Sequence, residues 1–136
     1  PAWGDPDLPF LNRLTMIISA HFDFLVENPL LPRFLINEIL SRPERYELLQ
    51  SRISQYAGVV FDNLQTEITK SVEKGEILPV DGKMLFINVM SLNVFTFIAY
   101  PLLETAMGDL MADRERFLAI RKAENIEVIM SRILKR

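Results

Sequence analysis

The chain has 136 residues, of which 49% are apolar and 24% charged, a composition typical of one globular domain. It contains no cysteine and a single histidine, which excludes disulfides, thiolate metal sites, cysteine nucleophiles and multi-histidine zinc sites. The formal net charge of −3 gives no overall attraction to nucleic acid or anionic lipid. We therefore expect a single domain over residues 1–136 that does not bind DNA by itself.

The first predicted helices follow from apolar residues at three- and four-residue steps, with little glycine and no persistent strand-like alternation. This pattern predicts an all-α fold of about five helices, arranged as an antiparallel bundle. The first helix is predicted over residues 8–27 and ends at Asn28-Pro29, and the second is short and ends near Leu40. The apolar stripe of the first helix consists of Leu11, Leu14, Ile18, Phe22 and Leu25.

The third predicted helix is the longest. Ser41 and Glu44 match a capping box, in which two side chains bond the free backbone N–H groups at a helix start. From there the helix is predicted to continue to Lys74, where Gly75 ends it. Its apolar face consists of Leu49, Ile53, Tyr56, Val60, Leu64, Ile68 and Val72.

The fourth predicted helix, over residues 82–100, has Asp81 as its expected N-cap and is followed by a looser stretch with Pro101 and Gly108. A fifth helix is predicted over residues 113–134. Residues 84–103 form a run of twenty without a charge. A helix that is apolar on all sides must be surrounded by protein or by lipid.

Three interpretations of this uncharged segment remain open: the buried central helix of a monomer, a membrane span, and a helix shared between two subunits. Asn88, Asn93 and Pro101 make a membrane span costly, so we expect none. We favour the shared helix, because five helices in 136 residues cannot easily bury every side of one of them. The fourth and fifth helices would then pair with a second copy as a four-helix interface. The expected interface residues are Leu92, Phe95, Ala99, Ile126, Met130 and Ile133.

Candidate chemistry is sparse. The sequence has no nucleophile-elbow motif and no glycine-rich phosphate loop, so we predict no catalytic residues, no metal and no cofactor. A lone helical histidine, His21, fits a boundary or core position as well as a polar position in a pocket. Aromatic residues with a few amides are typical of small-molecule pockets, although each alone would also fit a core. The expected ligand-binding residues are His21, Tyr56, Phe61, Gln65, Asn88 and Phe95.

The order of these features resembles the C-terminal domain of TetR-family transcription regulators. The resemblance lies in the Asn28-Pro29-Leu30 break, the short helix with Arg33-Phe34-Leu35-Ile36-Asn37-Glu38, and the long helix ending in Glu73-Lys74-Gly75-Glu76-Ile77. It continues through Leu78-Pro79-Val80-Asp81 into the apolar helix with Ser91-Leu92, Phe95 and Pro101-Leu102-Leu103. It spans nearly the whole chain, from about Leu8 to Leu134.

The resemblance implies a cytoplasmic homodimer that binds a small apolar effector, with DNA bound only through an N-terminal helix-turn-helix that has no counterpart here. The first residue is proline, so we expect a chain cut or processed from a longer protein, or one that lacks its upstream residues. Two other functions remain open. One is a helical module that docks a different protein, and the other is a carrier of, or an enzyme acting on, an apolar ligand.

Overall fold

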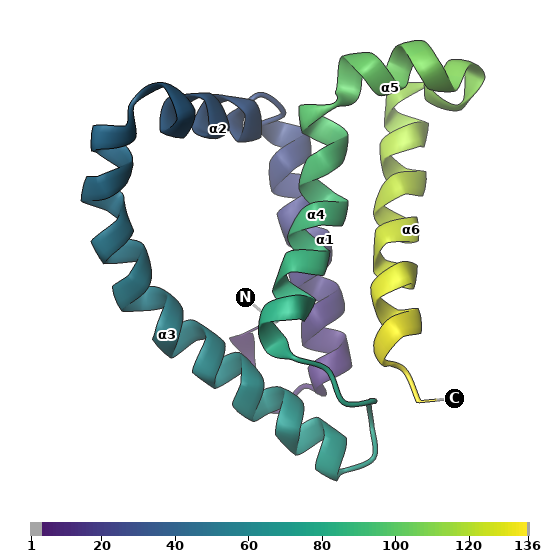
Figure 1. Cartoon of the computed structure of the whole chain (residues 1–136). Coiled ribbons are helices and arrows are strands. Elements are labelled where there is room, and N and C mark those ends of the chain that lie inside the picture. Colours follow the sequence, from purple (N-terminus) through teal and green to yellow (C-terminus); the bar gives the residue numbers. More distant parts are fainter. Residues whose placement is uncertain (1–3, 136) are drawn as a thin grey trace.

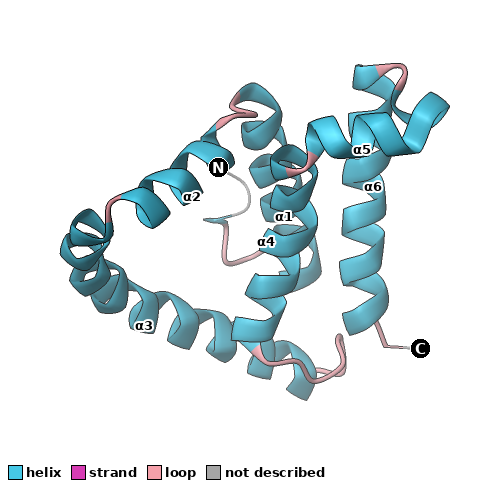
Figure 2. Ribbon diagram, turned by 45° about the horizontal axis from the view of Figure 1, so that its top comes forward, coloured by secondary structure: helices cyan, strands magenta, loops and turns pink. Residues whose placement is uncertain are grey.

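The computed structural model describes residues 4–135, and every regular element in that range is a helix (Figures 1 and 2). This confirms the all-α prediction. The elements are α1 (Phe10–Glu27), α2 (Leu31–Ser41), α3 (Pro43–Glu73), α4 (Gly82–Ile98), α5 (Tyr100–Met107), the short 3₁₀ helix η2 (Gly108–Met111) and α6 (Arg114–Ile133). There are six α-helices in this part of the chain and not five, because the stretch after α4 forms α5 and η2. Residues 1–3, which include the proline start, lie outside the described range.

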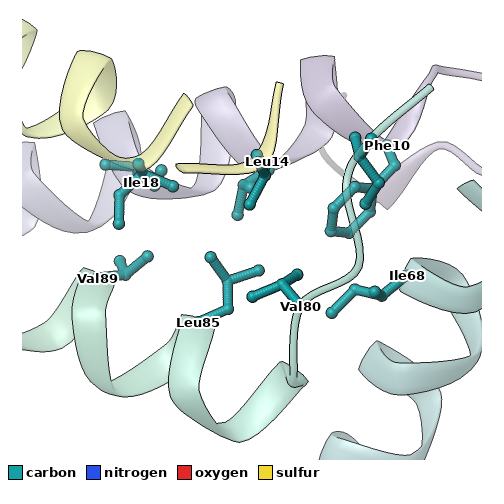
Figure 3. Close-up of a cluster of buried hydrophobic side chains, with 10 residues drawn as sticks. Phe10, Leu14, Ile18, Ile68, Val80, Leu85 and Val89 are labelled. Carbon is teal, nitrogen blue, oxygen red and sulfur yellow. The ribbon is translucent and has the colours of Figure 1, made fainter. Parts of the chain in front are cut away.

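Helices α1, α4 and α6 pack against one another and hold the core (Figure 1). Ile18 and Leu14 of α1 face Val89 and Leu85 of α4, with Ile68 of α3 nearby (Figure 3). A second apolar cluster lies toward α5 and consists of Phe22, Leu25, Phe97, Met111, Phe117 and Leu118. Four of the five stripe residues predicted on α1 are buried, and Leu11 is half-buried.

Helix α3 packs on the rest of the chain mainly through its C-terminal half, where Ile68 is buried and Leu64 and Val72 are half-buried. In Figures 1 and 2 it leaves the end of α2, arches away from α1 and α4, and returns to the start of α4. Its predicted apolar face is therefore only partly covered. The uncovered members of that face are Leu49, Ile53, Tyr56 and Val60.

Proline and glycine set several helix ends. The predicted capping box is wrong: Ser41 is the last residue of α2, and α3 begins after Arg42 with no side-chain cap. Pro43 causes this start, because a proline suits the first turn of a helix and holds the preceding residue out of the helical conformation. The predicted stop at Gly75 is confirmed, since Gly75 has φ 75° and α3 ends at Glu73.

The two ends of α4 are equally well defined. The predicted N-cap is confirmed, because the Asp81 carboxylate accepts hydrogen bonds from the backbone N–H groups of Lys83 (2.8 Å) and Met84 (3.1 Å). The helix ends at Ile98, just before Pro101 enters the first turn of α5. No single helix within residues 4–135 has the length and apolar character needed to cross a membrane. Helix α4 and residues 100–111 are long and apolar enough only when taken together, and a bend of 75° lies between them.

Candidate functional site

A chain of buried polar side chains crosses the core between α1, α4 and α6. Asn93 of α4 and Asn125 of α6 are both 0% exposed, and Nδ2 of Asn125 donates to Oδ1 of Asn93 at 3.0 Å. Nδ2 of Asn93 donates to the Ile18 carbonyl at 3.1 Å and lies 3.0 Å from Nδ1 of His21. Nδ2 of Asn125 also donates to the Leu92 carbonyl at 3.1 Å. The network ties together the three helices that hold the core.

The network fixes the proton on His21. Because Asn93 donates through Nδ2, Nδ1 of His21 must accept, and the neutral imidazole carries its proton on Nε2. Burial lowers the pKa of His21 below its usual value, since desolvation disfavours the charged ring. A protonated ring would also turn an N–H toward the Asn93 amide hydrogens. His21 is therefore a neutral, half-buried residue at the edge of the core.

Asn125 is the functional candidate that sequence reasoning missed. Its position gave a signal, because it stands in phase with Leu118 and Ile129, at a step where α6 presents apolar side chains to the core. Its Oδ1 atom is buried and meets no hydrogen-bond donor within residues 4–135. A polar atom left alone in this way costs free energy, which marks the position as unusual.

Two of the predicted ligand residues lie together beside the start of α4. Phe61 is half-buried and meets Phe86 edge to face, with ring centroids 5.2 Å apart. Oε1 of Gln65 accepts a hydrogen bond of 2.8 Å from the backbone N–H of Gly82. Gln65 thus joins α3 to the first turn of α4. Tyr56 of α3 lies five residues, or about 140° of helix rotation, from Phe61, and it is 68% exposed.

The other predicted ligand residues of α4 point elsewhere. Phe86 and Phe95 are nine residues apart, or about two and a half helical turns, so their side chains leave opposite sides of α4. Phe95 lines a groove formed with α5, η2 and α6, while Asn88 is exposed. Phe61 and Gln65 therefore do not lie together with Asn88 and Phe95, and a ligand-binding role for each of them stays a prediction. The sequence pattern placed apolar residues all around α4 and gave no means to tell its sides apart.

The expected interface residues differ in how deeply they are buried. Ile133 is 0% exposed and belongs to the chain's own core, so its placement on an exposed interface is wrong. Leu92, Ile126 and Met130 are half-buried and pack against the same core, and Ala99 is half-buried at the end of α4. Three- and four-residue steps placed these residues on one side of each helix, but neighbouring helices decide which side is covered.

The arrangement combines much uncovered apolar surface with one neutral imidazole. Ile17 and Phe24 of α1 stand at helical steps from His21, and both are exposed. Phe86 of α4 and the uncovered face of α3 add to this surface. Such surfaces bind apolar groups, and the Nε2–H of His21 is a hydrogen-bond donor beside them.

Comparison with models of protein families and with curated proteins gives no match.

Proposed function

We propose that this chain is the effector-sensing and dimer-forming domain of a TetR-type transcription regulator. In this proposal a small apolar effector binds against the uncovered faces of α1, α3 and α4, and DNA binding belongs to a longer parent protein. One observation carries the proposal: the apolar stripe of α3 continues through Leu49, Ile53, Tyr56 and Val60, and these side chains are left exposed by the rest of residues 4–135. Contiguous exposed apolar surface in a folded domain is typical of a binding site.

The residues around this surface also suit an apolar ligand with one polar group. The Phe61–Phe86 pair supplies aromatic surface between α3 and α4. His21 presents a neutral ring whose Nδ1 is already occupied by Asn93, which leaves Nε2–H for a ligand oxygen. A neutral donor favours a carbonyl or hydroxyl oxygen in the ligand.

The dimer in this proposal uses the sides of α4 and α6 that face away from α1. On α4, Met84 and Ser91 lie on the side opposite buried Asn93, and both are exposed. On α6, Val128 is exposed at the edge of the side that packs against the core. A second copy related by a two-fold axis would cover this surface as part of a four-helix interface.

The test of the effector site is a thermal-shift screen with small apolar compounds that carry one carbonyl or hydroxyl. We expect at least one to raise the melting temperature of the parent chain. Tyr56→Ala and Phe61→Ala should then weaken binding of that compound. Gln55→Ala is the matched control, because Gln55 is exposed on the same helix and points about 100° away from Tyr56 and about 120° away from Phe61.

Two outcomes would contradict the proposed effector site. Equal affinity of the parent, Tyr56→Ala and Phe61→Ala would place the ligand away from α3. A broad panel in which no compound stabilises the chain would favour the adaptor function instead.

A further inference from the structure

A second apolar recess lies on the other side of α4, where the chain turns back from α4 to α6. Helix α5 bends away from α4 by 75°, and Gly108, with φ 58°, lets η2 turn toward α6 (Figure 1). The bend holds apolar side chains over the end of α4 and leaves a groove of about 250 Å³. Six of the residues that line it are Phe95, Leu103, Met107, Leu110, Phe117 and Arg121.

The groove has a buried floor and an open apolar mouth. Phe117 and Met111 are buried beneath it, whereas Phe95, Met107 and Leu110 are each about half exposed. The volume lies just below the range of about 300–1,000 Å³ that is usual for small-molecule pockets. A ligand that fits here is therefore small.

Arg121 is the one charged residue of this lining. It is half-buried, and no hydrogen bond or ion pair within residues 4–135 engages its guanidinium. Lys122, the next residue, differs in this respect, because its Nζ lies 2.9 Å from Oδ1 of Asp23. An unpaired guanidinium beside an apolar recess is suited to a planar carboxylate, which accepts two parallel hydrogen bonds from it.

We propose that this groove binds a small amphipathic anion, a short apolar chain or ring that carries one carboxylate. The carboxylate pairs with Arg121, and the apolar body lies against Phe95, Met107 and Leu110. The site is distinct from the proposed effector surface, because Phe95 and Phe86 leave opposite sides of α4. A chain with both sites responds to two classes of ligand.

Octanoate is a suitable probe, with octanamide as its uncharged counterpart. Titration calorimetry of the parent chain should show saturable octanoate binding that weakens as salt is added, and much weaker binding of octanamide. Arg121→Gln should weaken octanoate binding about tenfold or more, the loss expected for a hydrogen-bonded charge pair. Arg116→Gln is the matched control, because Arg116 is exposed on the same helix and lines no part of the groove.

Two further variants separate this site from the effector surface. Met107→Ala, at a residue 48% exposed, tests the apolar half of the groove with little risk to folding and should also weaken octanoate binding. Phe61→Ala should leave octanoate binding unchanged. The proposal is overturned if Arg121→Gln binds octanoate as the parent does, or if octanamide binds as tightly as octanoate. Loss of octanoate binding in Phe61→Ala alone would also overturn it and would assign the probe to the effector surface.

Discussion

Single polar residues inside the core distinguish this chain from a simple apolar bundle. Asn93 makes three hydrogen bonds that reach α1 and α6, and it separates the apolar cluster around Leu85 from the cluster around Phe97. Oδ1 of Asn125 has no donor within residues 4–135, but the four hydrogen bonds of this network still restrict how the three helices can pack. We therefore expect Asn93 to fix the relative positions of α1, α4 and α6.

Asn93→Ala should lower the free energy of unfolding by about 1–3 kcal/mol, because the Ile18 carbonyl, Nδ1 of His21 and Nδ2 of Asn125 each lose their hydrogen bond to Asn93. Urea unfolding followed by circular dichroism measures the change. Asn63→Ala is the control, since Asn63 is exposed and should shift stability by no more than about 0.5 kcal/mol. Similar effects of the two variants would show that the network is not stabilising.

His21 should make stability depend on pH. Its pKa is lowered by burial in the folded chain, so at pH values below about 6.5 the unfolded chain takes up a proton first. The contribution of neutral His21 to the free energy of unfolding should therefore be complete above that pH. It should decrease as the pH falls toward the lower pKa of the folded state. Urea unfolding at a series of pH values checks this. His21→Gln should remove the dependence in this window, because the chain has no other histidine.

At the scale of the helices, the start of α4 is held by specific side chains. The first turn of α4 is held by the Asp81 carboxylate and by Gln65, which bonds the backbone of Gly82. There is little spare room at Gly82, where an added Cβ would lie 3.2 Å from Oε1 of Gln65 and 3.3 Å from Cγ of Leu64. The contact between α3 and α4 thus depends on a glycine predicted to start the fourth helix and on a glutamine predicted to line a pocket.

Asp81→Ala should lower the free energy of unfolding by about 0.5–2 kcal/mol, because two N–H groups in the first turn of α4 lose their acceptor. Asp81→Asn keeps an acceptor oxygen and should retain most of the stability. Thermal and urea unfolding of both variants distinguish loss of the cap from loss of the charge. Equal destabilisation by Ala and Asn would assign the effect to charge and not to capping.

At the scale of the whole molecule, the exposed sides of α4 and α6 are where two copies of the chain would associate in the proposed dimer. In the proposed dimer, Val128→Glu places two like charges near a two-fold axis in a dry environment. We expect the parent chain to be a dimer at micromolar concentration, and Val128→Glu to shift it toward monomer. Light scattering measures the mass, and circular dichroism reports whether the variant stays folded.

Val59→Glu is the matched control for this experiment, because Val59 is also exposed but lies on α3. It should leave the mass unchanged. Val128→Glu is a cleaner test than Ile126→Glu, since Ile126 packs against the chain's own core and its loss would also affect folding. A parent chain that stays monomeric and helical at high concentration would contradict the dimer.

The sequence by itself determined most of the helices, because apolar periodicity, proline, glycine and a capping aspartate act within one or two turns of the residue concerned. It therefore predicted the stripe of α1, the stop at Gly75 and the N-cap at Asp81. Contacts between distant residues were decided only by the tertiary structure. Helix α4 is apolar all around, so periodicity could not separate the side that meets Phe61 from the side that lines the groove with Arg121.

The same limit explains why the sequence misplaced Ile133 and did not predict the hydrogen bond between Asn125 and Asn93. A periodic pattern shows which residues share a helix side, but neighbouring helices decide whether that side is buried, and so Ile133 lies in the core. Asn125 stands in an apolar phase of α6, yet its bond to Asn93 joins residues 32 positions apart in the chain. Only the packing of α4 against α6 brings them together, because no local preference acts over that separation.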